Sequence, residues 1–249
     1  MIVTIFVLTL RQLLGKRRAV LMVGFGLLPV LASVLLRLNL DESTTDFDIA
    51  RWTALVLMNG LIVTTLLPLV ALVFGTSAIG GEIEDGTAVY LLAKPVARWK
   101  IVIAKLLAAW LVTALLVSAS AAISGGIAIN GSEDQGIVTG FVLATILGSL
   151  VYTCLFMLLS IVTSRSLIIG LIYVFFWESI VTGLFPGTET FSVRQYTIGF
   201  ARLASDASTL VFDARLDGNE ALGLMAGVSV VAILLAVRQL QRFEIGEST

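Results

Sequence analysis

The sequence predicts an all-α integral membrane protein, and three observations support this fold class. Of the 249 residues, 58% are hydrophobic and only 13% are charged, whereas about 25% of the residues in a soluble domain carry a charge. Several apolar runs reach the ~20 residues that an α-helix needs to cross a bilayer. The length of the chain suits one membrane domain without a large soluble appendage, so we expect a single transmembrane domain that covers residues 1–249.

We predict six membrane-spanning helices. The second, third and fourth are longer than a bilayer requires, so they are expected to tilt or to extend beyond the lipid. Pro29 and Pro68 fall inside two of the runs, where neighbouring helices can satisfy the carbonyl groups that a proline frees. The predicted spans are 19–37, 54–79, 101–129, 137–163, 167–185 and 221–238.

An N-terminal interfacial (elbow) helix is predicted for residues 1–18, because its apolar part is too short to span and a basic cluster follows. A helix of this kind lies in the plane of the membrane interface. The alternative is a plain extension of the first span. The apolar residues at helical spacing are Ile2, Ile5, Phe6, Leu10, Leu13 and Leu14, and the basic residues are Arg11, Lys16, Arg17 and Arg18.

The distribution of basic residues predicts the orientation. With the N-terminus inside, eleven of the sixteen Lys and Arg residues fall in cytoplasmic segments, as the positive-inside rule expects. Six spans then place both termini in the cytoplasm. The basic residues are scattered rather than gathered in one patch, so no nucleic-acid partner is expected.

A long outer loop is predicted for residues 186–220, with a short helix inside it. This helix either rests on or dips into the outer leaflet, or is an ordinary solvated loop helix. The residues that share its apolar face are Val193, Tyr196, Thr197, Phe200 and Leu203.

The segment 80–100, between the second and third spans, is the most informative part of the chain. Its acidic residues come first and its basic residues last, which suits the dipole of a helix. Pro95 disfavours helical geometry at Lys94, so a short helix should end there. From the residues alone, a rigid cytoplasmic helix and a simple intracellular loop are equally supported. Lys100 and Lys105 open the next span and are expected to reach the lipid headgroups.

This segment resembles the signature of the type-2 (ABC-2) permease family of ATP-binding-cassette transporters. The family pattern is an acidic residue, then Gly-Thr, a Leu pair, Pro-Val with a following Arg, and a Lys in the next span. The family often has a basic residue just after the first acid, whereas Ile83 stands there in this chain. The matching residues are Glu82, Gly86, Thr87, Leu91, Leu92, Pro95, Val96, Arg98 and Lys105. The interfacial helix, the six spans and the long outer loop also fit the family, including its branch associated with multicopper-enzyme maturation.

The resemblance implies the membrane permease subunit of an ATP-driven exporter in a prokaryotic plasma (inner) membrane. Residues 80–100 would form a coupling helix that binds a separate cytoplasmic ABC ATPase, and a second permease copy or a paralogue would complete the transporter. ATP and Mg²⁺ would bind to the ATPase, because this chain has no Gly-x-x-x-x-Gly-Lys-Ser/Thr loop. No catalytic, cofactor-binding or metal-binding residue is therefore expected here. The predicted ATPase-coupling residues are Glu82, Glu84, Asp85, Gly86, Thr87, Leu91, Leu92, Pro95 and Arg98.

Other functions are weighed against this one. The chain has no histidine, which removes His-based nucleophile pairs and the usual zinc hydrolase sites, so an intramembrane enzyme is disfavoured. A secondary carrier would need internal symmetry and several intramembrane charges. A membrane scaffold or sensor subunit that binds an ATPase without transporting anything would share the same coupling segment. The single cysteine, Cys154, is expected to be a small buried side chain.

Two polar residues within spans are candidates for the substrate path. Glu178 lies in the fifth span and Asn59 in the second. An ionised carboxylate within lipid costs at least ~2.5 kcal/mol, so Glu178 should face a polar partner or a cavity. The otherwise apolar spans favour a lipidic or amphipathic substrate.

Small residues repeat every four positions in three spans, where they allow close helix contacts. They either pack helices within one subunit or form a dimer seam. These residues are Ala114, Ser118, Ala122 and Gly126, then Gly136, Gly140, Ala144 and Gly148, and finally Gly223 and Gly227.

Overall fold

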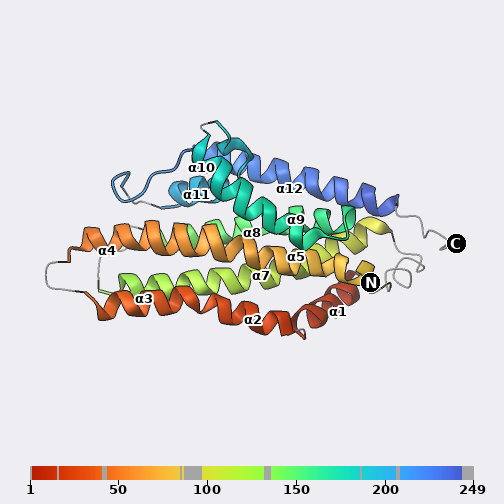
Figure 1. Cartoon of the computed structure of the whole chain (residues 1–249), viewed down its shortest axis with the longest axis horizontal. Helices are drawn as coiled ribbons and strands as arrows, with labels where there is room; N and C mark the ends of the chain where they lie inside the picture. The colour runs from red at the N-terminus through yellow and green to blue at the C-terminus, as the bar shows by residue number, and fades with distance from the viewer. Residues whose placement is uncertain are drawn as a thin grey trace.

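The computed structural model describes residues 2–15, 17–40, 44–84, 86, 97–131, 136–185, 187–205 and 208–242. Within these ranges all regular structure is helical, and most of the helices lie side by side in an elongated bundle (Figure 1). The helices are α1 (Ile2–Leu14), α2 (Arg17–Gly26), α3 (Leu28–Leu38), α4 (Asp46–Trp52), η1 (Thr53–Leu66), α5 (Leu67–Glu84), α7 (Arg98–Ile129), α8 (Ile137–Val162), α9 (Ser166–Ile172), η2 (Tyr173–Val181), α10 (Thr182–Leu184), η3 (Glu189–Phe191), α11 (Val193–Leu203) and α12 (Gly218–Gln241).

Five helices are long and apolar enough to cross a membrane, and each overlaps one of the predicted spans. The predicted span 167–185 overlaps α9, η2 and α10, whose apolar stretch Ser166–Glu178 is shorter. The described residues thus support five spans, and the sixth stays a prediction. The five helices are Arg18–Leu38, Asp46–Ile83, Arg98–Ile129, Ile137–Val162 and Gly218–Gln241.

The two ends of the bundle carry different segments. The start of α1 and the end of α12 lie at the same end, together with the end of α5 and the start of α7 (Figure 1). We call this the α5–α7 end. The opposite end, where α3 stops and α4 begins, is called the α3–α4 end.

The first long helix breaks at Leu27, between α2 and α3. Pro29 follows two residues later, and a proline removes a backbone donor and crowds the preceding turn. At the break, the hydroxyl of Ser120 in α7 donates a hydrogen bond of 2.6 Å to the carbonyl of Gly26. A neighbouring helix therefore satisfies a backbone group at the break, as a lipid environment requires.

The second long helix is π-helical over η1, with hydrogen bonds that reach back five residues. The N–H of Leu67 bonds to the carbonyl of Ile62, and the hydroxyl of Thr64 donates to the carbonyl of Asn59 at 2.7 Å. Pro68 follows directly, and its ring would clash with the carbonyl four residues earlier in a regular α-helix. The wider turns before Pro68 relieve this clash.

Helix α8 lies at the centre of the molecule, and α5, α7, α11 and α12 all pack on it. Glycines allow the closest approaches: a Cβ atom at Gly75 of α5 would lie 3.3 Å from the carbonyl oxygen of Thr153. Tyr152 and Phe156 stack beside this contact, with ring centroids 5.8 Å apart, and both are buried. Cys154 is also buried, as expected.

The small residues of α8 pack within the chain rather than against a second copy. A Cβ atom at Gly140 would lie 2.8 Å from the carbonyl oxygen of Ala201, and one at Gly148 would lie 2.5 Å from the hydroxyl of Thr197. Both contacts are with α11. By contrast, a Cβ atom at Gly223 or at Gly227 would meet nothing within 4 Å, so a seam through this face of α12 stays a prediction.

Helix α11 corresponds to the short helix predicted in the outer loop. It packs on α8 and α12, and its residues Val193, Tyr196 and Thr197 are buried. A helix packed against α8 and α12 is neither of the two expected arrangements, which were a helix on the outer leaflet and a solvated loop helix. Leu203, which was expected on the apolar face, is 48% exposed.

Candidate coupling and transport sites

The predicted coupling segment connects the end of α5 to the start of α7. Glu82 and Glu84 lie in the last turn of α5, and Arg98 begins α7. Gly86 adopts a φ of 68°, and its N–H donates to the carbonyl of Ile83 at 3.2 Å. A glycine in this left-handed conformation is a common way to end a helix, which gives the glycine of the motif a physical role. The predicted coupling residues Asp85, Thr87, Leu91, Leu92 and Pro95, with Val96, lie outside the described residues, so a coupling helix stays a prediction.

An ion pair joins the two helices that flank this segment. The Nζ of Lys105 lies 2.6 Å from Oε1 of Glu82 and 2.7 Å from the carbonyl oxygen of Ala78. Lys105 is only 1% exposed, whereas the side chain of Glu82 is 19% exposed. The expectation that Lys105 reaches the lipid headgroups is therefore wrong. Its stem instead runs into the interface between α5 and α7, where a carboxylate and a carbonyl solvate the ammonium group.

Apolar packing surrounds the ion pair. Ile79 of α5 and Ile101, Val102 and Leu106 of α7 are buried in one cluster. With the ion pair inside this cluster, the end of α5 and the start of α7 are fixed to each other. A displacement imposed on the connecting segment would thus move both helices together.

The first turn of α7 presents an aromatic and basic surface beside this pair. Trp99 is 48% exposed, and the Nζ of Lys100 lies 5.6 Å from the centroid of its ring. Exposed tryptophans and basic residues are typical of the membrane interface. The start of α7 is therefore suited to the boundary between lipid and water.

A second polar site surrounds Glu178, which is 2% exposed. Its carboxylate accepts hydrogen bonds from the hydroxyl of Tyr173 at 2.8 Å and the hydroxyl of Ser192 at 2.5 Å. It also accepts from the backbone N–H groups of Val193 at 3.0 Å and Arg194 at 3.4 Å. Four donors of the chain itself thus solvate the carboxylate.

These donors place Glu178 at the N-terminus of α11. Ser192 is the N-cap residue of that helix, and its hydroxyl also accepts from the N–H of Gln195 at 3.3 Å. The first N–H groups of a helix lack partners within the helix and carry partial positive charge. Glu178 and Ser192 together satisfy three of them, and this anchors α11 to η2.

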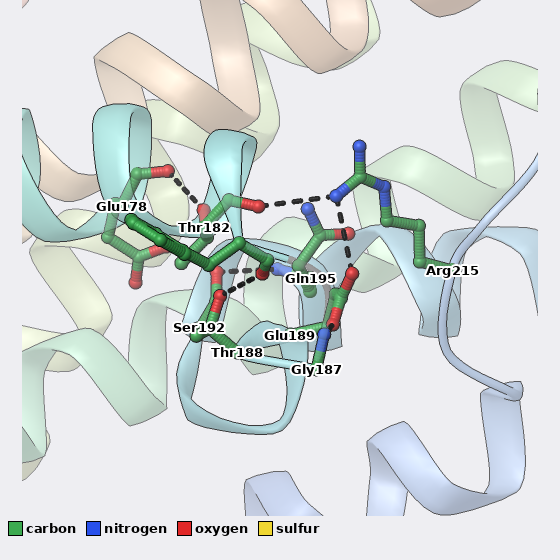
Figure 2. A network of polar contacts seen from close by, with 9 residues as sticks. Glu178, Thr182, Gly187, Thr188, Glu189, Ser192, Gln195 and Arg215 are labelled. Atoms are coloured by element: carbon green, nitrogen blue, oxygen red, sulfur yellow. Dashed lines mark hydrogen bonds and ion pairs between the residues drawn. The ribbon is translucent and has the colours of Figure 1, made fainter.

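The network extends into the loop before α12, as Figure 2 shows. The guanidinium of Arg215 donates to the carbonyl of Thr182 at 3.2 Å and contacts Oε1 of Glu189 at 3.3 Å. The other carboxylate oxygen of Glu189 accepts from the N–H of Gly187 at 2.6 Å. Because the hydroxyl of Thr182 donates to the carbonyl of Glu178, the same set of contacts holds η2, α10 and the loop together.

Asn59 and Glu178, the two residues predicted for the substrate path, are connected through Arg194. The Nη2 of Arg194 donates to Oδ1 of Asn59 at 3.3 Å, while the backbone N–H of the same residue bonds to Glu178. Arg194 was not among the residues predicted for this site, because nothing in the local sequence marks it as a contact of Asn59. Its contacts depend on α11 folding back between helices that are distant in the sequence.

The arrangement around Glu178 supports a structural anchor more directly than contact with a substrate. The described partners of its carboxylate all belong to the chain, so its role in a substrate path stays a prediction. Within the described ranges no cluster of three or more His, Cys, Asp or Glu side chains could hold a metal ion.

Comparison with known proteins identifies one family. The family model described as ABC-2 family transporter protein matches residues 6–240, which is almost the whole chain. The match does not extend to the branch associated with multicopper-enzyme maturation, which stays a prediction. No curated protein matches the sequence.

Proposed function

Because the chain belongs to the ABC-2 family of transporter proteins, and is thus a membrane component of ABC transporters, we propose that it is the permease subunit of an ATP-driven exporter. The observation that carries this proposal is the ion pair between Lys105 and Glu82. It fixes the two helices on either side of the segment that resembles the coupling motif of the family.

In the proposed mechanism, a separate cytoplasmic ABC ATPase binds the segment 80–100, which connects α5 to α7. Binding and hydrolysis of ATP, with Mg²⁺, take place on that partner. Closure of the ATPase pushes the segment, and the linked ends of α5 and α7 transmit the displacement along the bundle. Since α8 packs against both helices, the movement reaches α11 and the polar site at Glu178.

We further propose six spans, with α9, η2 and α10 as the fifth, in a prokaryotic plasma membrane. The α5–α7 end, with both termini, then faces the cytoplasm. A second copy of the chain or a paralogue pairs with it. The exposed surface of the long helices is apolar, which favours a lipidic or amphipathic substrate.

The test of this proposal uses charge reversal in the segment that would contact the ATPase. We expect Glu84→Lys combined with Asp85→Lys to abolish copurification of an ATPase from mild detergent, because both acidic groups would then repel the surface that they bind. Asp46→Lys, at the opposite end of the bundle, is the matched control and should retain the ATPase. If the double variant binds the ATPase as well as the unmodified chain does, residues 84–85 do not form the contact.

A non-transporting scaffold would also bind an ATPase. Turnover by the copurified complex therefore has to be measured in vesicles with added amphipathic compounds. Stimulation of ATPase activity by a compound that accumulates inside inverted vesicles supports export. Turnover that no compound alters, with no accumulation, contradicts it.

A further inference from the structure

An apolar groove of about 460 Å³ runs along the outside of the bundle, where α1, α2 and α3 meet α7. Its walls include Leu14 of α1 and Val23 of α2, and its floor includes Leu115 and Ala119 of α7. The side chains of Leu14, Val23 and Leu115 are 56%, 55% and 61% exposed. Among the described residues that line the groove none is charged, and Ser120, which does line it, donates its hydroxyl to the carbonyl of Gly26.

The bend between α1 and α2 produces the groove. Helices α1 and α2 point in different directions (Figure 1), so that α1 packs on α7 and α2 departs from it towards α3. The break at Leu27 then brings the first long helix back to α7, where a Cβ atom at Gly26 would lie 2.9 Å from Leu116. The groove lies beside these contacts and continues past Leu116 to Ile123 of α7 and to Val30 of α3.

The length of the groove matches one leaflet of a membrane. Its lining on α7 extends from Leu111 to Ile123, which is ~18 Å at ~1.5 Å per residue. The hydrocarbon core of a bilayer is ~30 Å thick, so one leaflet is about 15 Å. The groove is therefore long enough for one extended acyl chain.

The charge at the bend is of a single sign. Arg11 and Arg18 are adjacent in sequence to the lining residues Leu10 and Ala19 and are exposed. Lys16 and Arg17 add two further basic residues, and the first 40 residues contain no acidic residue at all. Among the described contacts, neither Arg11 nor Arg18 has an acidic partner. Basic residues at the rim of a lipid-facing groove attract anionic headgroups.

We propose that this groove binds one anionic phospholipid, with an acyl chain along α7 and the headgroup phosphate against Arg11 and Arg18. Guanidinium groups form bidentate hydrogen bonds with phosphate oxygens, and the recessed apolar lining separates this lipid from the bulk bilayer. The lipid is a ligand that fixes the position of α1, distinct from any transported substrate, and the inference does not depend on the proposed transport function.

The experiment is native mass spectrometry of the full chain, delipidated in mild detergent and titrated with dioleoyl phosphatidylglycerol or dioleoyl phosphatidylcholine. These lipids have the same acyl chains and differ in headgroup charge. We expect one phosphatidylglycerol to be retained in preference to phosphatidylcholine. The double substitution Arg11→Gln and Arg18→Gln should reduce this preference by about fivefold for each arginine removed. Ala119→Trp, which fills the groove from an exposed position, should abolish retention of either lipid.

Two control variants make the result specific. Arg238→Gln removes an exposed arginine at the same end of the bundle, from the last turn of α12. Val230→Trp adds the same bulk at a position on α12 that is 54% exposed. Both should bind phosphatidylglycerol as the unmodified chain does, and all variants should keep its thermal unfolding temperature.

Three results would overturn the proposal. Equal retention of the two lipids would remove the role of headgroup charge. Undiminished binding to the Ala119→Trp variant would place the lipid elsewhere. A dimer that Ala119→Trp dissociates, with no change in bound lipid, would show that a second copy covers the groove.

Discussion

Lys105 and Glu82 form an ion pair between α7 and α5, the two helices on either side of the segment proposed to bind the ATPase. The 2.6 Å contact between Nζ and Oε1 joins the last turn of α5 to a position two turns into α7. Its partners differ in environment, because Lys105 is sealed from solvent while Glu82 is partly exposed. Removing one partner should therefore not have the same effect as removing the other.

Glu82→Leu is expected to be the more destabilising change. It removes the carboxylate that lies 2.6 Å from the buried ammonium group of Lys105, and breaking a buried pair in this way costs about 3–5 kcal/mol. Lys105→Met should cost less, because Glu82 can turn towards water. The double variant should recover most of the loss. Thermal unfolding in detergent measures all three, and equal losses for the two single variants would contradict this account.

Glu178→Gln is expected to loosen α11. An NH2 group replaces one carboxylate oxygen and cannot accept a hydrogen bond, so the backbone N–H of Val193 or of Arg194 loses its acceptor, while the hydroxyl that donated to the same oxygen must turn round. An unsatisfied buried polar group costs about 1–3 kcal/mol. Hydrogen exchange over residues 192–203 should become faster. Glu220→Gln is the control, since Glu220 lies exposed in the first turn of α12. Unchanged exchange in the Glu178 variant would mean that Ser192 alone caps the helix.

Gly148→Ala should disrupt the contact between α8 and α11. The added Cβ atom would lie 2.5 Å from the hydroxyl oxygen and 3.1 Å from the methyl carbon of Thr197, and overpacking of this kind costs about 1–3 kcal/mol. Gly223→Ala, where the added atom meets nothing within 4 Å, should raise stability by up to about 1 kcal/mol through helix propensity. If the unfolding temperatures of the two variants shifted in the same direction, the packing described here would be contradicted.

The loop contact at Glu189 should depend on pH. Hydrogen bonds from its own backbone N–H and that of Gly187, together with the charge of Arg215, lower the pKa of Glu189 below its ordinary value of 4.5. The ionised carboxylate of Glu189 therefore stabilises the loop fully above pH 4.5. This stabilisation is lost as the pH falls through the lower pKa that Glu189 has in the folded state. Limited proteolysis of residues 187–191 should become faster on acidification. Glu189→Gln should be cleaved at a rate that does not change over this range; the same pH dependence in that variant would assign the effect to another group.

The positions of the long helices could be predicted from the sequence, because a run of apolar residues identifies a helix in lipid without knowledge of its neighbours. The burial of the Lys105 side chain could not be predicted in the same way. A lysine near a predicted helix end normally extends towards the headgroups, and only the placement of Glu82, 23 residues earlier, draws it inwards. Contacts of this kind depend on how the helices are packed.

The same limit applies to the polar site. Glu178 and Asn59 could be identified from the sequence because polar residues are unusual within a span, and this requires no knowledge of their neighbours. Their connection through Arg194 requires α11 to lie between η1, η2 and α8, and no local pattern encodes that arrangement. The glycines of α8 predicted that another helix approaches closely, but they did not identify α11 as that helix.

The wide turns of η1 have a consequence for how this helix can change. A π-helical stretch contains more residues in each turn than an α-helix does, so loss of one residue from 53–66 would let it tighten without breaking the chain. The tighter turns would take up the missing residue, so the part of the helix that precedes the deletion would keep its orientation relative to Pro68. In a regular α-helix, by contrast, a deletion between Asn59 and Pro68 would rotate that part by about 100°, the angle between successive residues, and Asn59 would point away from Arg194. The wide turns of η1 thus allow this helix to lose a residue while the side chains that it presents to α11 stay in place.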